Sequence, residues 1–477
     1  MFGFLILALL IVFVAIVIRR TKNFTPKAQP AISDEEIIFD KDGATHALAE
    51  LIKCKTISYS DPSLEDDAEF EKLIVKLPEL YPNVFKTCDF KQMPHRGLLF
   101  KWPGKEAGDP AVLMAHYDVV PVNEENWDKP PFEAIIEDGV MWGRGTLDTK
   151  VTFNGVLYAA NHLIAEGFVP EHDVYFAFSG GEEVNGLGAS AIVDWFENHG
   201  ITPAMVVDEG GAVVENVFPG VKQPCGLIGI AEKGMINAQF RTMSNGGHAS
   251  APKPHTPVGV LAQACCDVEN NPFDAHIEGP AGQMFDTLGR HSSLLYRVIF
   301  ANMWCFGWVI DLLGKKSGGE MNALIRTTVA FTQMEGSSAR NVIPPEATMV
   351  ANLRLNPSDS VESTLEKLRN IVDNDAVEIT SLGHFEPSRI STTDCEGWEK
   401  VSAAVAETWR GCIVSPYLMV QCSDSRHYGR ISDKVYRFSA MDLTAAERAT
   451  IHGNNERIRL DCLHRAVEFY IRLMKKC

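Results

Sequence analysis

The sequence predicts an α/β protein: a mostly parallel sheet flanked by helices, a smaller inserted α+β unit, and one N-terminal transmembrane helix. Three observations predict this arrangement. Apolar strand-like runs alternate with helical patterns, which is the order of a parallel α/β layer. The pattern then changes to paired strands in the middle of the chain, and the first 18 residues carry no charged side chain. A chain of 477 residues is also too long for one ordinary core.

The N-terminal segment, residues 1–18, is long enough as a helix to span about 27 Å, close to the thickness of a bilayer core. Arg19, Arg20 and Lys22 follow it directly. A cleaved signal peptide would have a basic start and a small-residue cleavage site, so an uncleaved single-pass anchor is expected. The positive-inside rule places the main domain in the cytoplasm, but the sequon at Asn23 leaves the side of the membrane open.

The chain after the anchor is expected to divide into a linker, two halves of a catalytic domain and an insertion between them. Catalytic strands and helices alternate, with helices expected at 44–54, 149–166, 186–199 and 458–475 and strands at 110–115, 172–178 and 204–208. The predicted boundaries are 1–20 for the anchor, 21–44 for the linker, 45–223 and 379–477 for the catalytic domain, and 224–378 for the insertion.

The inserted unit is predicted from strands at 226–243, 322–334 and 347–355 and from helices at about 255–267 and 360–373. Residues 293–314 interrupt this unit with a markedly apolar stretch. Arg297 and Asp311 argue against a second membrane span there. Two interpretations stay open: the stretch covers a core, or it forms a hydrophobic wall for a ligand.

The formal net charge of −18 opposes binding to nucleic acid, because such binding depends on neutralising phosphates with lysine and arginine. The acid excess instead favours a bound cation where carboxylates are buried together.

Polar segments follow the predicted strands, at the edge of the sheet where sites of α/β proteins form. His116 and Asp118 lie two residues apart, so on a strand end they project to one face, where Asp118 could orient the imidazole. The other candidates are imidazoles and carboxylates in comparable positions: Asp148, Glu182, Glu183, Asp208 or Glu209, and His452. Each alone has a structural explanation, such as a helix cap or a surface acid. Five of them, His116, Asp148, Glu183, Asp208 or Glu209, and His452, form a mixed nitrogen and oxygen set that suits zinc or another divalent transition metal. Two imidazoles and three carboxylates are more than one catalytic zinc usually takes, which points to a two-metal site with a bridging carboxylate.

Eight ordered motifs carry a resemblance to a known family: MAHYDVVP, WGRGTLDTK, SGGEEVNGLGAS, VVDEGG, SNGGHASAP, NVIPPEATMVANLRLNP, CSDSRHY and IHGNNERI. They resemble the co-catalytic zinc hydrolases of the aminoacylase and carboxypeptidase S family, nearest the branch of carboxypeptidase S and the N-fatty-acyl-amino-acid hydrolases. The resemblance covers the chain from about residue 45 to its end. It implies a di-zinc exopeptidase-like catalytic domain with an inserted lid or dimerisation domain.

The resemblance also implies roles for single residues. His116, Asp148, Glu183, Glu209 and His452 would hold two zinc ions, with Asp148 bridging and with Glu209 favoured over Asp208. His116 and Glu209 would serve different ions, and so would Glu183 and His452. Glu182 would be the general base. A cis peptide bond is expected between Asp148 and Thr149.

Three further residues are assigned by the resemblance or by their chemistry. The resemblance makes His248, in the insertion, an oxyanion stabiliser that reaches the site of a partner subunit in a homodimer; otherwise it would be a loop histidine capping a helix. Arg354 and Arg426 are candidates for holding a substrate carboxylate, because guanidinium matches carboxylate geometry. Surface salt bridges are the alternative for both.

The sequence therefore predicts a membrane-anchored, zinc-dependent hydrolase that cleaves the amide bond of N-acyl amino acids or short peptides with a free carboxylate. Two alternatives stay open: a carboxypeptidase or dipeptidase acting on short peptides, and a catalytically inactive scaffold that keeps the fold.

Overall fold

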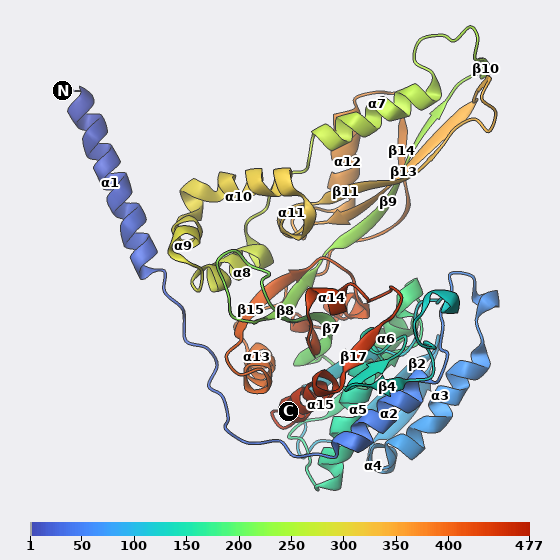
Figure 1. The fold of residues 1–477 in the computed structure, drawn as a ribbon, viewed down its shortest axis with the longest axis vertical. Helices are drawn as coiled ribbons and strands as arrows, with labels where there is room; N and C mark the ends of the chain where they lie inside the picture. Colours follow the sequence, from blue (N-terminus) through green and yellow to red (C-terminus); the bar gives the residue numbers. More distant parts are fainter. Residues whose placement is uncertain (1) are drawn as a thin grey trace.

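The computed structural model describes residues 2–477 and contains two sheet-based units and a separate N-terminal helix (Figure 1). Helix α1 (Phe2–Asn23) lies beside the inserted unit, and an extended segment connects it to the larger unit below. The larger unit corresponds to the predicted catalytic domain and is called the catalytic unit below. This helix is long and apolar enough to cross a membrane.

The catalytic unit is built on an eight-stranded sheet with a parallel centre. In spatial order its strands are β1 (Asp89–Met93), β2 (Gly97–Trp102), β6 (Val174–Ser179), β3 (Ala111–His116), β7 (Met205–Val214), β16 (Val435–Asp442), β8 (Cys225–Glu232) and β15 (Ile413–Met419). Strands β6, β3, β7 and β16 run parallel, whereas β1, β2 and the β16–β8 pairing are antiparallel. The sheet is therefore mixed: β1 and β2 form an antiparallel hairpin at one edge, and β8 toward the other edge runs antiparallel to β16.

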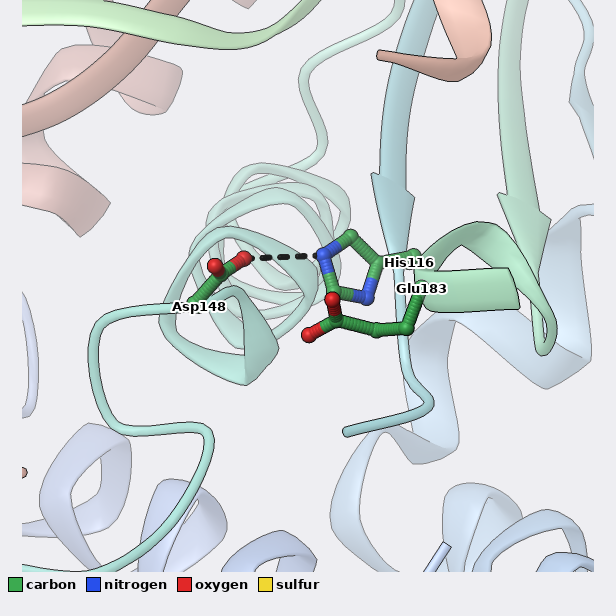
Figure 2. Close-up of side chains that lie close together, drawn as sticks. All are labelled: His116, Asp148 and Glu183. Carbon is green, nitrogen blue, oxygen red and sulfur yellow. Dashed lines mark hydrogen bonds and ion pairs between the residues drawn. The ribbon is translucent and has the colours of Figure 1, made fainter. Parts of the chain in front are cut away.

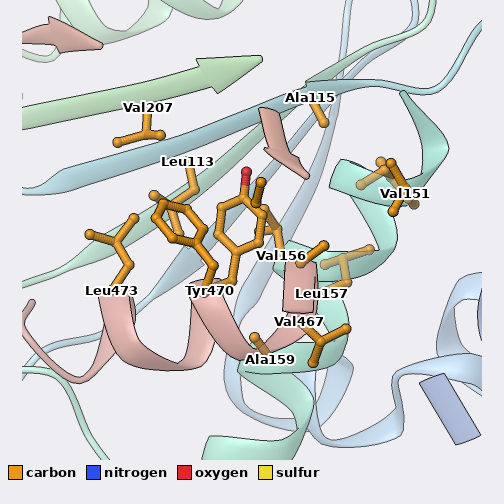
Figure 3. Packing of buried hydrophobic residues seen from close by; sticks show 14 of the residues in the cluster. Leu113, Ala115, Val151, Val156, Leu157, Ala159, Val207, Val467, Tyr470 and Leu473 are labelled. Carbon is orange, nitrogen blue, oxygen red and sulfur yellow. The ribbon is translucent and has the colours of Figure 1, made fainter. Parts of the chain in front are cut away.

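Helices cover both faces of this sheet, so alternate residues of β3 enter different cores. Leu113 and Ala115 belong to one apolar cluster, while Val112 and Met114 belong to another. Leu113 packs near Tyr470 and Leu473 of α15 (Figure 3). The second cluster includes side chains of helix α6 (Gly188–Asn198). The first cluster includes side chains of six helices: α2 (Lys41–Ile52), α3 (Asp67–Leu80), α4 (Pro82–Thr87), α5 (Lys150–Ala165), α13 (Glu396–Thr408) and α15 (Leu460–Met474).

A small three-stranded sheet joins two distant parts of the chain near the site. Its strands are β17 (Arg457–Arg459), β5 (Val140–Trp142) and β4 (Ile135–Glu137). Pairing of β17 with β5 brings the segment after Trp142 beside the segment before Arg457. The remaining short elements are η1 (Pro62–Leu64), η2 (Glu124–Asn126), η3 (Glu182–Val184), η4 (Asp424–Arg430) and α14 (Ala445–Arg448).

The inserted unit holds a four-stranded antiparallel sheet covered by two helices. The strands, in order, are β11 (Thr328–Glu335), β13 (Glu346–Leu355), β9 (Gly234–Met243) and β14 (Glu378–Phe385), and the helices are α7 (Pro257–Asn270) and α12 (Val361–Val372). Strands β10 (Gly247–His248) and β12 (Val342–Ile343) pair at the end of this unit farthest from the large sheet (Figure 1).

Two strand predictions at this unit were wrong. The strand predicted at 226–243 is two strands, of which β8 belongs to the large sheet and β9 to the small one. The apolar pattern continues on both sides of Lys233, so the sequence does not show where β8 ends and β9 begins. The two strands are distinguished only by the strands with which each of them pairs. The strand predicted at 322–334 begins as helix α11 (Gly319–Ile325). We accordingly propose that the insertion spans about 234–385 rather than 224–378.

Four helices between the two units form their own apolar cluster: α8 (Gly279–Gly289), α9 (Leu294–Ala301), α10 (Met303–Ser317) and α11. They pack against residues of the large sheet such as Val214, Leu227 and Leu418. The apolar stretch at 293–314 thus forms α9 and α10, which are bent by 112° relative to each other.

Candidate active site

The site begins at the end of the buried strand β3, where His116 is turned toward a group of carboxylates. The ring nitrogen Nδ1 lies 3.0 Å from the backbone oxygen of Asp118 and 3.4 Å from its carboxylate oxygen Oδ1. Asp118 therefore orients the ring through two acceptors, and Nε2 is left facing the site.

Asp148 lies between two imidazoles. Its Oδ1 is 2.9 Å from Nε2 of His116, and its Oδ2 is 3.0 Å from Nε2 of His452. Figure 2 shows His116, Asp148 and Glu183 converging from separate elements. The Asp148–Thr149 peptide bond is cis, which confirms the expectation. His452 has a left-handed backbone with φ 59°, a conformation rare for a residue with a side chain.

Glu182 and Glu183 lie on the turn η3, directly after strand β6. Their backbone nitrogens donate to Oδ1 and Oδ2 of Asp118 at 3.1 and 3.2 Å. Asp118 thus fixes this turn as well as the His116 ring. The side chain of Glu183 reaches His452, with Oε2 3.0 Å from Nε2.

Asp208 and Glu209 are consecutive on strand β7, but their carboxylates have different neighbours. Oε1 of Glu209 lies 3.4 Å from Nε2 of His116. Asp208 is buried and accepts a hydrogen bond of 2.9 Å from the backbone nitrogen of Ser425. Glu209 is therefore the acid that faces His116, and Asp208 holds the segment containing Arg426.

Candidate ligand atoms converge in two overlapping groups, within 4.8 Å of one another in each. One group contains His116, Asp148 and Glu183, and the other contains His116, Glu182 and Glu209. Oε1 of Glu183 is buried without a hydrogen-bond partner among residues 2–477. Imidazole nitrogens and carboxylate oxygens without a thiolate are a donor set that fits zinc or a similar divalent cation.

Electrostatics also favours a cation in this site. Burial raises the pKa of Glu209 to about 8, and burial raises the pKa values of Glu182 and Glu183. Burial also acts to raise the pKa of Asp148, but hydrogen bonds from His116 and His452 outweigh it and lower that pKa. Carboxylates that resist ionisation when crowded together would be held ionised by a divalent cation.

Arg426 and Arg354 contact residues outside the cluster itself. Nη2 of Arg426 is 3.4 Å from Oδ1 of Asn185, the residue that follows η3. Nη1 of Arg354 is 3.1 Å from the sulfur of Cys422, in the segment that leads to Arg426. Neither arginine forms a salt bridge among residues 2–477, and their role in binding a carboxylate stays a prediction.

His248 is not brought to the cluster within one chain. It lies exposed on β10, at the end of the inserted unit farthest from the large sheet (Figure 1). Its Nδ1 lies 2.8 Å from the hydroxyl of Ser250.

Glu456 supports the site structurally, a role that was not predicted from the sequence. Its buried carboxylate accepts hydrogen bonds from the backbone nitrogens of Gly145, Leu147 and Asp148, and it pairs with Arg144 at 2.7 Å. It therefore holds the loop that presents Asp148. Its place in the motif IHGNNERI, four residues after the predicted ligand His452, was the available signal.

A cavity of about 850 Å³ extends from the carboxylates into an apolar region. The polar end includes Asp148, Glu182, Glu183, Glu209 and His452. The apolar wall includes Met284 of α8, Met321 and Leu324 of α11, and Tyr417 of β15. Residues 293–314 do not line this cavity, so the interpretation of that stretch as a ligand wall was wrong.

Imidazoles and carboxylates gathered where parallel strands end are the arrangement of a metal-dependent hydrolase. Comparison with known proteins gives the family: residues 112–476 match the model of the peptidase family M20/M25/M40. The chain belongs to this family of metal-dependent peptidases and hydrolases, as its resemblance predicted.

Two relatives and one solved structure illustrate the similarity. The chain is 33% identical to the probable carboxypeptidase S-like 2 of Dictyostelium discoideum, over 90% of this chain and 84% of the relative. It is 32% identical to the N-fatty-acyl-amino acid synthase/hydrolase PM20D1 of Xenopus tropicalis, over 98% of this chain and 93% of the relative. An M20 family metallo-carboxypeptidase from Sulfolobus solfataricus shares the fold, with a TM-score of 0.66 and 18% identity over 91% of this chain and 98% of that one.

Proposed function

We propose that the protein is a two-zinc hydrolase that cleaves the amide bond of N-acyl amino acids with long, apolar acyl chains. The observation that carries the proposal is the cavity, which joins the carboxylate and imidazole cluster to an apolar wall formed by Met284, Met321 and Leu324. Such a cavity suits a substrate with a polar amide at one end and a hydrocarbon chain at the other.

The distances support a pairing of ligands that differs from the expected one. His116 lies beside Glu209, and His452 lies beside Glu183, with one oxygen of Asp148 near each imidazole. His116 and Glu209 would thus hold one zinc ion, and His452 and Glu183 the other, with Asp148 shared between them.

Zinc, when bound, would acidify a water and polarise the amide carbonyl. Glu182, fixed by the hydrogen bond from its backbone to Asp118, would take the proton of the attacking water and pass it to the leaving nitrogen. Arg426 and Arg354 would bind the free carboxylate of the amino acid. Asp118 would hold the His116 ring and the turn that carries Glu182 in fixed positions relative to each other.

Helix α1 would be an uncleaved membrane anchor. Its apolar length supports this, and so do contacts of its last turns with the inserted helices. The backbone after it is also held, since Arg290 Nη1 donates to the Thr25 oxygen at 3.0 Å.

The test is a substrate series on the purified full chain in detergent, with metal analysis of the same sample. N-acyl phenylalanines from acetyl to palmitoyl are compared with dipeptides. We expect two zinc ions per chain and a kcat/KM that rises by up to roughly fourfold per methylene, from about 0.8 kcal/mol of burial each.

A matched pair of variants locates the effect. Met321→Trp, which narrows the cavity, should flatten the length profile, whereas Met334→Trp, on an exposed position of β11, should not. A flat profile with good dipeptide turnover would establish the dipeptidase alternative. Full zinc content without hydrolysis of any substrate would establish the inactive scaffold.

A further inference from the structure

Helices α9 and α10 carry large apolar side chains that point away from the protein. Trp304 is 56% exposed and Trp308 is 65% exposed. With Leu312 they recur every four residues, so they lie along one face of α10. Leu294, Leu295 and Leu313 are also exposed. This α9–α10 hairpin therefore has an apolar face that residues 2–477 cover only in part.

The same face lies against α1. The rings of Phe13 and Trp304 meet edge to face, with centroids 5.8 Å apart. Nearer the end of α1, Nε of Arg20 donates to the Ala301 oxygen at 3.1 Å, and Nδ2 of Asn302 donates to the Thr21 hydroxyl at 3.2 Å. Figure 1 shows α9 and α10 beside α1, on the side away from the catalytic unit. The apolar surface of the hairpin is thus continuous with the apolar surface of α1.

The depth of these contacts along α1 suits an interfacial helix. The apolar run of α1 ends at Arg19, which marks the level of the headgroups. Phe13 lies six positions earlier, which is ~9 Å deeper in a helix. Trp304 contacts Phe13, and interfacial helices bury their apolar faces by about 5–10 Å.

The charges of the hairpin agree with this orientation. Asp311 is half-buried and pairs with the buried Arg326 and, at 3.0 Å, with Lys315. Lys315 and Lys316 stand exposed in the last turn of α10, where they can meet anionic headgroups. The bend of 112° and the short lengths of both helices exclude one straight span.

We infer that the α9–α10 hairpin inserts its apolar face into one leaflet of a lipid bilayer beside α1. The protein would then be held by two elements, a spanning helix and an interfacial hairpin, and so in a fixed orientation. Helices α8 and α11, which carry Met284 and Leu324 of the cavity wall, adjoin the hairpin in the same apolar cluster. If the proposed function holds, the acyl end of the cavity therefore lies on the membrane side.

Tryptophan quenching tests the inference without any measurement of activity. Among residues 2–477, Trp304 and Trp308 are the exposed tryptophans, and α1 contains none. The full chain is reconstituted in phosphatidylcholine and phosphatidylglycerol vesicles with acyl chains brominated near the headgroup. We expect lower emission than in unbrominated vesicles, and no such loss in the Trp304→Phe, Trp308→Phe double variant.

The control is Trp195→Phe, on α6 of the catalytic unit, which should keep the quenching. Each single variant, Trp304→Phe or Trp308→Phe, should lose part of it. Equal emission of the parent protein in both kinds of vesicle would overturn the inference. Equal quenching of the parent and the double variant would overturn it as well.

Discussion

His116 and His452, 336 positions apart in the chain, face opposite oxygens of one carboxylate. Asp148 lies 2.9 Å from the first imidazole and 3.0 Å from the second. A carboxylate in this position can bridge two cations.

Glu182→Gln should abolish turnover and leave metal content unchanged, because it removes the proton acceptor but none of the proposed ligands. Loss of a general base typically lowers kcat by roughly 100- to 10,000-fold. The measurement is kcat with zinc content on one preparation, with exposed Glu79→Gln as control. Near-normal kcat in the Glu182 variant would remove it from the mechanism.

Glu456→Gln should destabilise the loop that presents Asp148. The Arg144–Glu456 pair is buried, and breaking such a pair costs about 3–5 kcal/mol. We also expect weaker zinc binding by roughly 10- to 100-fold, as for residues that orient ligands. Urea unfolding and a chelator competition measure the two effects. Zinc affinity equal to that of the parent would show that Glu456 does not position Asp148.

The metal-free protein should lose stability as the pH rises from about 4.5 to 8. Burial raises the folded pKa of Glu209 to about 8, above its ordinary value, so the unfolded chain releases this proton first. The stability due to protonated Glu209 is complete below the unfolded pKa and is lost as the pH passes through the folded one. Tm after removal of metal should fall over this range, and less steeply in Glu209→Gln. An identical slope in the variant would contradict this assignment.

His248→Ala should lower kcat by roughly 100- to 1,000-fold with zinc content unchanged, if the residue stabilises an oxyanion. Its position at the far end of the inserted unit requires that it act on a partner subunit. Mixing inactive His248→Ala and Glu182→Gln subunits should then restore part of the activity. A proven mixed dimer without any recovery would leave His248 with a local role only.

The α9–α10 hairpin shows that an apolar composition can be recognised in the sequence without the direction in which its side chains point. Residues 293–314 were recognisably apolar, but composition does not say which side of a helix meets protein. In the structure this stretch packs on α1 and on the large sheet, and Trp304 and Trp308 are exposed. The wall of the cavity is formed instead by Met284, Met321 and Leu324. The wall residues are separated in sequence and carry no motif, so no local pattern could have marked them.

The sequence alone determined the α/β order, the apolar N-terminal helix and the set of imidazoles and carboxylates, because each depends on a local pattern at a strand end or in a continuous run. Only the tertiary structure decided that β8 and β9 belong to different sheets, that Glu209 rather than Asp208 faces His116, and that Glu456 holds the Asp148 loop. These facts depend on strand pairing and on contacts between residues hundreds of positions apart. The alternation of side chains along a strand predicts which residues share a face. The strands with which it pairs determine which part of the protein that face contacts.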